Sequence, residues 1–488
     1  MTPLHPFQTG SSFSAMGSKA NDLHMLFFPF MMQSHLLPLV DIANIFASRG
    51  ARITFLTTDV TASIIRPTID DSVHLHIISI PYAEFGLPDG CEDNDFPLSL
   101  DLRKNFFKAV ASLCHPFDAV LRDLIPDCVV TDMFLPWTYH VAAARGIPRL
   151  VFQGISNFSL CIMDAYERCC PLLGEAESFV LPGLPHRIEL LKTQALDLNK
   201  LAGTPMEFML EIFKEIHEVE PKSYGTVMNS FYELEPQYVD HHREVMGRRV
   251  WNVGPVSLCN QNVTYKLARG GEQPTLASEC LKWLDKKSRG SVVYICFGSK
   301  GIFSVAQLKE MALGLEASNH SFIWVVQNGE NNWFPEGYDE RIKGRGMVIR
   351  GWAPQLLILN HIAVGGFVTH CGWNSSLEGI CAGLPMITWP LGAEQFYNEK
   401  LLVEVLKVGV EVGSKVFEFN PETRPIIEAS IIEAAVRNLM GEGEVAVERR
   451  RRAKILGENA RRAIEKGGSS YNEIEKLMQE LINQRKHV

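Results

Sequence analysis

The sequence predicts an α/β fold with two Rossmann-like domains, each built on a parallel sheet. Short apolar runs of strand length alternate with longer helical patterns through most of the chain, which is the order of βαβ units. This alternation stops in a polar stretch with Asn and paired Gly residues at 257–275 and then starts again. A chain of 488 residues is also too long for a single hydrophobic core, so two domains are expected.

Composition narrows the class of protein. Hydrophobic residues make up 46% of the chain and charged residues 21%, which is ordinary for a soluble globular protein. The formal charge of −9, from 47 basic and 56 acidic residues, argues against a nucleic-acid partner. The 11 cysteines have no repeated spacing, so they indicate neither a disulfide framework nor a zinc site. They are typical of reduced thiols, and we expect a cytoplasmic protein.

The order of segments along the chain defines the expected domains. Residues 1–22 are polar without an apolar core, so we expect a disordered leader and not a signal peptide. The apolar run at 23–40 contains Pro29, His35 and Pro38 and falls short of a membrane span, so no membrane insertion is expected. The other segments are an N-terminal Rossmann-like domain at 23–256, an interdomain linker at 257–275, a C-terminal Rossmann-like domain at 276–466 and a C-terminal helix at 467–488.

In the N-terminal half, short buried-strand patterns alternate with helical ones. Strands are expected at 23–30, 51–57, 73–80, 128–131, 150–152, 225–229 and 250–253. Helices are expected at 36–49, 102–124 and 205–218, and residues 183–202 have the composition of a loop. The first of these helices ends at Gly50, a common residue after a helix C-terminus.

The C-terminal half repeats the same alternation. Strands are expected at 291–297, 321–326, 347–350 and 385–389. Helices are expected at 278–285, 305–317 and 396–406, followed by a basic helix at 445–466 and an amphipathic helix at 470–484.

The most informative motif of the chain begins at Trp352 and ends at Gln395. It reads WAPQLLILNHIAVGGFVTHCGWNSSLEGICAGLPMITWPLGAEQ. Within it the strand pattern GGFVTH breaks at CGWNS and gives way to the helical pattern SLEGICAG. A strand, a glycine-containing turn and a helix N-terminus bind a diphosphate on unpaired backbone N–H groups. With a Trp to stack on a base and an acidic–amide pair for hydroxyl groups, the motif predicts a nucleotide-sugar site.

Two polar side chains in the N-terminal half fall at the carboxyl ends of predicted strands. His35 follows the first strand and Asp132 follows the strand at 128–131, at the edge where doubly wound sheets bind ligands. An imidazole is a suitable base near neutral pH, and a carboxylate on its other nitrogen would fix the tautomer. From spacing alone the plainer interpretation is structural, with His35 capping a helix and Asp132 ending a strand.

The motif at 352–395 resembles the signature box of plant family 1 UDP-dependent glycosyltransferases. The resemblance extends to the His35 segment, the Phe297-Gly-Ser turn and the chain length, and so covers nearly everything after residue 22. It implies the GT-B fold, in which two facing Rossmann-like domains bind the acceptor (N-terminal) and the UDP-sugar (C-terminal). In that family the last helix packs back on the N-terminal domain.

The resemblance also implies roles for individual residues. His35 would be the catalytic base and Asp132 its partner, although Ser34 stands where the family usually has Gly. The predicted donor-binding residues are Trp352 and Ala353 for uracil, Gln355 and Glu378 for ribose, Ser299, His370, Asn374 and Ser375 for the diphosphate, and Trp373, Glu394 and Gln395 for the sugar. An alternative interpretation, in which Cys371 is a nucleophile with His370 as its base, explains these two residues less well than the signature box does.

The donor and the metal requirement follow from the same residues. A terminal Gln such as Gln395 usually accompanies glucose in the family, which favours UDP-glucose as the co-substrate. A helix N-terminus, neutral donors and a His can stabilise the leaving UDP in place of a cation. With no DxD-type carboxylate pair positioned at the phosphate turn, we expect neither a metal nor another cofactor.

Residues around the expected base are apolar and aromatic, which suits a lipophilic acceptor. Each of them could equally belong to the core. The candidates for the acceptor pocket are Met31, Phe85, Phe134, Trp137 and Phe158. The GAEQFYNEK segment resembles a subgroup that acts on flavonoids and other phenolics or on triterpenoid and steroid aglycones.

We therefore expect an inverting O-glucosyltransferase, acting as a monomer on UDP-glucose and a lipophilic plant metabolite. One alternative is an enzyme that extends an existing glycoside or uses another UDP-sugar. Another is a catalytically silent UDP-sugar-binding partner protein. An NAD(P)-dependent oxidoreductase would share the fold class, but Gly344-Arg-Gly346 lacks the third glycine of a dinucleotide fingerprint.

Overall fold

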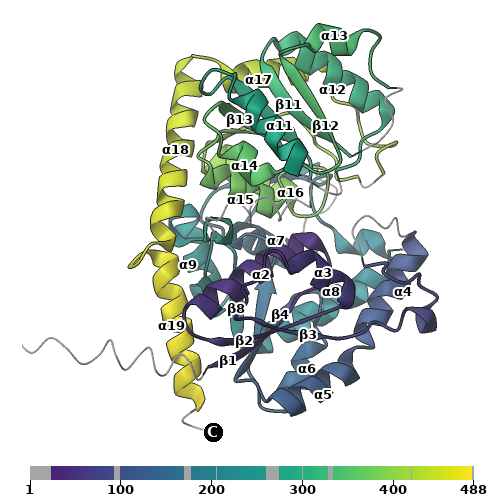
Figure 1. Cartoon of the computed structure of the whole chain (residues 1–488), viewed down its shortest axis with the longest axis vertical. Coiled ribbons are helices and arrows are strands. Elements are labelled where there is room, and N and C mark those ends of the chain that lie inside the picture. Colours follow the sequence, from purple (N-terminus) through teal and green to yellow (C-terminus); the bar gives the residue numbers. More distant parts are fainter. Residues whose placement is uncertain are drawn as a thin grey trace, which may run out of the picture. The chain divides into compact units, whose positions relative to one another are not determined.

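Two parallel sheets dominate the computed structural model, as the sequence predicts (Figure 1). The structure describes residues 23–92, 99–169, 177–204, 206–259, 274–298, 301–327, 333–418 and 420–485. The leader at 1–22, Ser299 and most of the linker at 257–275 lie outside the described residues, so these predictions stay untested.

The described residues group into two compact units, each built from separate stretches of the chain. Unit 1 comprises the described residues of Met1–Phe152, Glu215–Gly225 and Asn472–Val488, and unit 2 the described residues of Gln153–Lys214 and Thr226–Tyr471. None of the described helices combines the length and the apolar composition that crossing a membrane requires.

The first sheet has seven strands in the order β3-β2-β1-β4-β5-β8-β9. Their bounds are β1 (His24–Phe28), β2 (Arg52–Thr57), β3 (His74–Ile77), β4 (Cys128–Asp132), β5 (Arg149–Gln153), β8 (Gly225–Met228) and β9 (Val250–Asn252). All five residues of β1 are buried, as expected for a central strand of a parallel sheet covered on both faces. Because Phe28 pairs with Thr131, β1 and β4 end at the same edge of the sheet.

The second sheet has six parallel strands in the order β12-β11-β10-β13-β14-β15. Their bounds are β10 (Val292–Cys296), β11 (Ser321–Val326), β12 (Gly346–Arg350), β13 (Val364–Thr369), β14 (Met386–Thr388) and β15 (Gly409–Glu411). Thr369 pairs with Cys296 on one side and with Thr388 on the other. The segments that follow β10, β13 and β14 therefore leave the sheet at one edge.

The helices connect the strands in the alternating order expected of βαβ units. Those that precede residue 260 are α2 (Gln33–Ser48), α3 (Asp59–Ile65), α4 (Leu100–Ala111), α5 (Cys114–Leu124), α6 (Thr138–Ala143), α7 (Asn157–Cys169), α8 (Phe208–Val219) and α9 (Pro236–Glu244). Those that follow residue 273 are α11 (Pro274–Leu284), α12 (Val305–Ser318), α13 (Tyr338–Ile342), α14 (Gln355–Leu359), α15 (Trp373–Cys381), α16 (Gln395–Lys400), α17 (Ala429–Met440), α18 (Glu444–Ile464) and α19 (Ser469–Gln484), with a π-helical turn at Leu401–Val405 after α16.

Two expectations from the sequence are wrong in detail. The single helix expected at 102–124 is two helices, α4 and α5, separated at Ser112 and Leu113. Pro116 explains the break, because it has no N–H for the carbonyl of residue 112 but is tolerated in the first turn of α5. The loop expected at 183–202 contains β7 (Ile188–Leu191), which pairs antiparallel with β6 (Ser178–Leu181) in a small hairpin.

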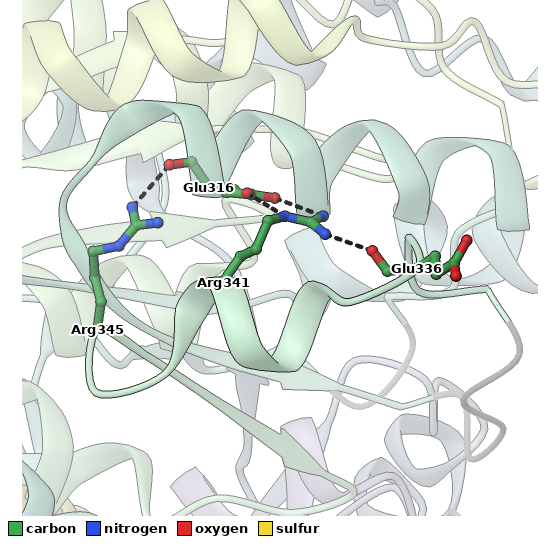
Figure 2. A network of polar contacts seen from close by, with 4 residues as sticks. All are labelled: Glu316, Glu336, Arg341 and Arg345. Carbon is green, nitrogen blue, oxygen red and sulfur yellow. Dashed lines mark hydrogen bonds and ion pairs between the residues drawn. The ribbon is translucent and has the colours of Figure 1, made fainter.

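Short α13 is held against the end of α12 by polar contacts at the surface of unit 2 (Figure 2). The Arg341 guanidinium donates to both carboxylate oxygens of Glu316, at 2.6 and 3.1 Å, and also to the carbonyl of Glu336. Arg345 donates to the backbone carbonyl of Glu316 at 2.8 Å. Exposed pairs of this kind contribute little stability, so we assign the network to orienting α13 before β12.

Candidate active site

His35 and Asp132 form a hydrogen-bonded pair at the edge of the first sheet. His35 lies in the first turn of α2, and Asp132 is the last residue of β4 and fully buried. His35 Nδ1 lies 2.8 Å from Asp132 Oδ2, and the backbone N–H of Phe134 donates to Oδ1 at 2.9 Å. An ionised carboxylate only accepts hydrogen bonds, so Nδ1 carries the proton and Nε2 keeps its lone pair. The arrangement has the geometry of a general base with an orienting carboxylate.

A buried arginine that carries no recognisable sequence signal supports the loop that follows Asp132. Arg149 donates from Nε to Thr131 Oγ1 at 2.7 Å and from Nη2 to the carbonyl of Asp132 at 3.3 Å. Burial lowers the pKa of Arg149 to about 10, so its side chain remains cationic at neutral pH.

Aromatic rings surround the His35 imidazole. The ring of Phe134 lies 5.3 Å from it and that of Phe30 lies 6.4 Å away, centroid to centroid. Phe30 in turn stacks on Phe107 of α4 at 5.1 Å. Of the predicted pocket residues, Phe134 therefore lies beside the base, and Phe107 is a neighbour that the sequence did not single out.

The other acceptor candidates lie in different surroundings. Met31 is buried in the core of unit 1, and Phe85 is partly buried at its margin. Trp137 packs edge-on against Phe117, 5.6 Å away, within that same core. Phe158 is fully buried in unit 2 and packs against Tyr238 at 4.5 Å, so we leave it out of the proposed pocket.

The turn between β13 and α15 carries the predicted phosphate residues. His370 and Cys371 connect the strand to Gly372, the N-cap residue of α15, and Asn374 and Ser375 lie in the first turn of that helix. Helix N-termini present unpaired N–H groups to an anion. Desolvation lowers the pKa of His370 to about 4, so its ring is neutral at physiological pH and can donate one N–H.

Two glycines make room for the His370 ring. A Cβ at Gly372 would lie 2.4 Å from His370 Nε2, and one at Gly298 would lie 2.9 Å from its Cε1. Gly298 also has a φ of +69°, which disfavours any other residue. These contacts give a physical reason for the glycines of the FGS turn and of the HCGWN segment. Ser299 itself lies outside the described residues.

The predicted ribose residues form a hydrogen-bonded chain. Gln355 Nε2 donates to Glu378 Oε2 at 2.7 Å, while its Oε1 accepts from the Tyr294 hydroxyl at 3.3 Å. Tyr294 is fully buried in β10, and sequence reasoning missed it because a buried tyrosine in a strand has no distinctive pattern. The chain fixes which way the Gln355 amide and the Glu378 carboxylate point.

The two tryptophans of the box have different surroundings. Trp352 is partly buried, and its indole N–H has no partner among the described residues. Ala353, the predicted uracil contact beside it, is 6% exposed. Trp373 is buried and donates its indole N–H to the carbonyl of Asn229 at 2.8 Å, so this side-chain donor is already used. A sugar contact by Trp373 would therefore come from its backbone N–H at the start of α15.

Glu394 and Gln395 begin α16. Gln395 Oε1 accepts from the backbone N–H groups of Leu391 and Gly392, at 2.9 and 3.0 Å, which directs the NH₂ end of its amide away from that turn. Ala393, which precedes Glu394, has a φ of 51°, a strained conformation for a residue other than glycine. Such strain is often kept at ligand sites.

Among the residues that the structure describes, no group of three His, Cys, Asp or Glu side chains is arranged to hold a metal ion. The groups at the phosphate turn are amides, hydroxyls and a neutral imidazole, which can donate hydrogen bonds directly to phosphate oxygens.

The fold and these two sets of residues define a nucleotide-sugar-dependent transferase, and comparison with known proteins gives the family. Residues 206–416 match the family described as UDP-glucoronosyl and UDP-glucosyl transferase. The chain is 45% identical to scopoletin glucosyltransferase of Nicotiana tabacum over 470 residues, which is 94% of this chain and 98% of the relative. It is 44% identical to anthocyanin 3'-O-beta-glucosyltransferase of Gentiana triflora, with the same coverage.

A solved structure agrees with the sequence matches. UGT73P12 of Glycyrrhiza uralensis, solved in complex with glycyrrhetinic acid 3-O-monoglucuronide, aligns with a TM-score of 0.87 and 40% identity, covering 95% of this chain and 97% of that one. The protein belongs to the plant family 1 UDP-glycosyltransferases, which confirms the resemblance and the GT-B fold class.

Proposed function

We propose that the protein transfers glucose from UDP-glucose to a hydroxyl group of a lipophilic plant metabolite, with inversion at the anomeric carbon. The observation that carries the proposal is the 2.8 Å hydrogen bond between His35, in the first turn of the helix that follows β1, and Asp132, the last residue of β4. The names of its relatives, which include glucosyltransferases for scopoletin and anthocyanin, support glucose as the sugar.

In the proposed reaction, His35 Nε2 takes the proton of the acceptor hydroxyl, and Asp132 stabilises the imidazolium that forms. The acceptor oxygen then attacks the anomeric carbon as the bond from that carbon to the diphosphate breaks. UDP leaves with the electron pair, and an α-linked donor gives a β-glucoside. General-base catalysis of this kind typically contributes about 10²–10⁴-fold to the rate.

The proposed donor site holds UDP without a metal ion. Trp352 stacks on uracil with Ala353 beside it, and Gln355 and Glu378 bind ribose. His370, Asn374, Ser375 and the N-terminus of α15 bind the diphosphate, and Ser299 is assigned to the same group. The amide N–H groups of Gln395 and the carboxylate of Glu394 bind the sugar hydroxyls.

The proposed acceptor is planar or bulky and apolar, because aromatic rings line the base. Phe134 and Phe30 flank the imidazole, and Phe107 extends the aromatic surface. A second candidate function is extension of an existing glycoside, favoured by the structural relative at 40% identity that was solved with a monoglucuronide. In that case the acceptor hydroxyl belongs to a sugar.

The test is product formation by the purified enzyme with UDP-glucose and a panel of phenolics, flavonoids, triterpenoids, steroids and their monoglycosides. We expect a product heavier by one hexose, detected by mass spectrometry, and its absence in the His35→Ala variant while UDP still binds. Wild-type turnover by His35→Ala would overturn the mechanism. UDP binding without any product would favour a silent partner protein or another donor sugar.

The expected monomeric state and cytoplasmic location stay predictions of the same proposal. Light scattering of the purified chain and fractionation of plant cells would check them.

A further inference from the structure

We infer that Asn398, to which neither the resemblance nor the comparisons give a role, positions the Glu394 carboxylate relative to the phosphate turn. In this way it sets the discrimination between donor sugars. Asn398 lies in the middle of α16 and is fully buried. The inference rests on the donor site proposed above and goes beyond it by naming a residue that bonds to the Cys371 carbonyl and to Glu394.

Asn398 joins the two parts of the donor site through one amide group. Its Nδ2 donates to the carbonyl of Cys371, in the phosphate turn, at 2.8 Å. The same nitrogen lies 3.4 Å from Glu394 Oε1, one helical turn earlier in sequence. A backbone carbonyl and a carboxylate both accept hydrogen bonds, so only the NH₂ end of the amide can face them.

The oxygen end of the amide is held from the other side. Asn398 Oδ1 lies 3.1 Å from Ser156 Oγ and 2.9 Å from Ser159 Oγ. Ser156 Oγ also accepts from the backbone N–H of Ser159, which fixes this serine at the N-terminus of α7. All four hydrogen-bonding positions of a buried amide are therefore occupied, which is the condition under which a buried polar group specifies one arrangement.

The two segments that Asn398 contacts each contain a residue with a strained backbone conformation. Cys371 has a φ of 64° and Ala393, next to Glu394, has a φ of 51°, both in the left-handed region that disfavours side chains. Strained backbone persists only where the surroundings determine it. Asn398 contacts the carbonyl of one strained residue and the carboxylate that follows the other, so it couples the two turns.

The fixed position of the Glu394 carboxylate affects which sugar the donor site recognises. A carboxylate held in one place rejects a sugar whose hydroxyl points elsewhere, because its acceptor is then left unpaired. If Glu394 were released, UDP-glucose and UDP-galactose would be distinguished less well. Asn398 is thus a positioning residue, since it acts through Glu394 and the phosphate turn.

The test compares Asn398→Asp with the matched control Gln307→Ala. Gln307 is another buried amide of unit 2, and it holds the backbone of Ile427 at 2.7 and 2.9 Å. The readouts are kcat/KM for UDP-glucose and for UDP-galactose, calorimetric affinity for UDP and for each UDP-sugar, and Tm. Ratios between donors do not depend on the fraction of folded enzyme.

We expect Asn398→Asp to lower the ratio of kcat/KM for glucose over galactose by about tenfold, the effect of misplacing one charge-assisted hydrogen bond. Ser159→Ala, a milder change in case the first variant does not fold, should shift the ratio in the same direction. Gln307→Ala should lower Tm and leave the ratio unchanged. A lower Tm with the wild-type ratio in both Asn398→Asp and Ser159→Ala would overturn the inference.

Failure of the underlying function has a different signature. If the wild type binds UDP-sugars without turnover, the calorimetric preference for UDP-glucose over UDP-galactose still tests Asn398. If the wild type does not bind UDP at all, the proposed donor site is wrong, and the inference is overturned with it.

Discussion

At the scale of single residues, the proposed chemistry depends on one hydrogen bond that sets a tautomer. Asp132 accepts a hydrogen bond from His35 Nδ1 on one carboxylate oxygen and from the backbone N–H of Phe134 on the other. Asp132→Asn keeps the shape of the side chain but turns its NH₂ end or its neutral oxygen toward the imidazole. The ring then loses the carboxylate that stabilises the imidazolium.

We expect Asp132→Asn to lower kcat by roughly 10²–10⁴-fold. Affinity for UDP should stay within about twofold, since the described residues proposed for the donor lie in turns and helices of unit 2. Steady-state kinetics and calorimetry would measure the two effects. A kcat within threefold of wild type would show that Asp132 only ends its strand, the plainer interpretation of the sequence.

A second residue, Glu399, makes the stability of the folded protein depend on pH. Burial raises the pKa of Glu399 to about 8, so the folded protein keeps this carboxyl protonated, whereas an unfolded chain releases the proton near 4.5. Between pH 4.5 and about 8 the folded state therefore binds more protons than the unfolded state. The free energy of unfolding that Glu399 contributes falls as the pH rises through this range.

Glu399→Gln, which is neutral at every pH, should therefore gain Tm relative to wild type as the pH is raised from 5 to 8. Glu404→Gln is the control, because Glu404 is 39% exposed and pairs with Lys400 on the same stretch of chain. Parallel Tm profiles for wild type and Glu399→Gln would contradict the prediction. Comparing differences between variants removes the contributions of other titrating groups, such as His370.

Sequence analysis singled out residues proposed to face the substrates, but not the buried residues that form hydrogen bonds with them. His35 and Asp132 could be proposed because they follow strands of the first sheet, and the box because a glycine turn follows a strand of the second sheet. Asn398, Tyr294 and Arg149 could not, because their roles come from hydrogen bonds between segments distant in sequence. The one available signal was that Asn398 follows Glu394 by four residues, which puts both on one face of a helix.

At the scale of elements, alternation of apolar runs predicted both sheets, while local breaks in the pattern were harder to predict. Sequence analysis did not single out α17, although it covers part of the second sheet through Val436 and Leu439. Its packing depends on Gly314 of α12, a position where helix propensity and packing oppose each other. Propensity alone favours Ala over Gly by about 1 kcal/mol in a helix interior.

We expect packing to decide the sign at this position. A Cβ on Gly314 would lie 2.7 Å from the carbonyl of Ala429 and 2.8 Å from Ile432 Cβ, so α17 would have to shift. Overpacking of this kind typically costs about 1–3 kcal/mol. Gly314→Ala should thus lower the free energy of unfolding, whereas Leu313→Ala, at a 41% exposed neighbour, should change it by less than about 0.5 kcal/mol. A stabilised Gly314→Ala protein in urea denaturation would show that the α12–α17 contact adapts.

At the scale of the whole molecule, an acidic protein is proposed to bind a doubly charged diphosphate. The formal charge of −9 opposes the approach of UDP-glucose, and the residues assigned to the phosphates are neutral. His370 belongs to this neutral set, because desolvation lowers its pKa to about 4. The attraction then comes from short-range hydrogen bonds and from the N-terminus of α15, which salt screens less than long-range charge.

The effects of salt and of a chelator therefore distinguish this neutral donor site from one that binds the diphosphate through a metal ion or through Lys and Arg side chains. Raising NaCl from about 20 to 300 mM shortens the screening length several-fold and weakens the repulsion from the acidic surface as well as any attraction. We expect the Kd for UDP to change by less than about threefold, and the glucosyl-transfer rate to be unaffected by excess EDTA. Isothermal titration at several salt concentrations and rate assays with and without EDTA would measure both. A site that used a divalent cation would lose its rate in EDTA, and one that used Lys or Arg side chains would lose affinity by tenfold or more in salt, so each result would name the missing positive charge.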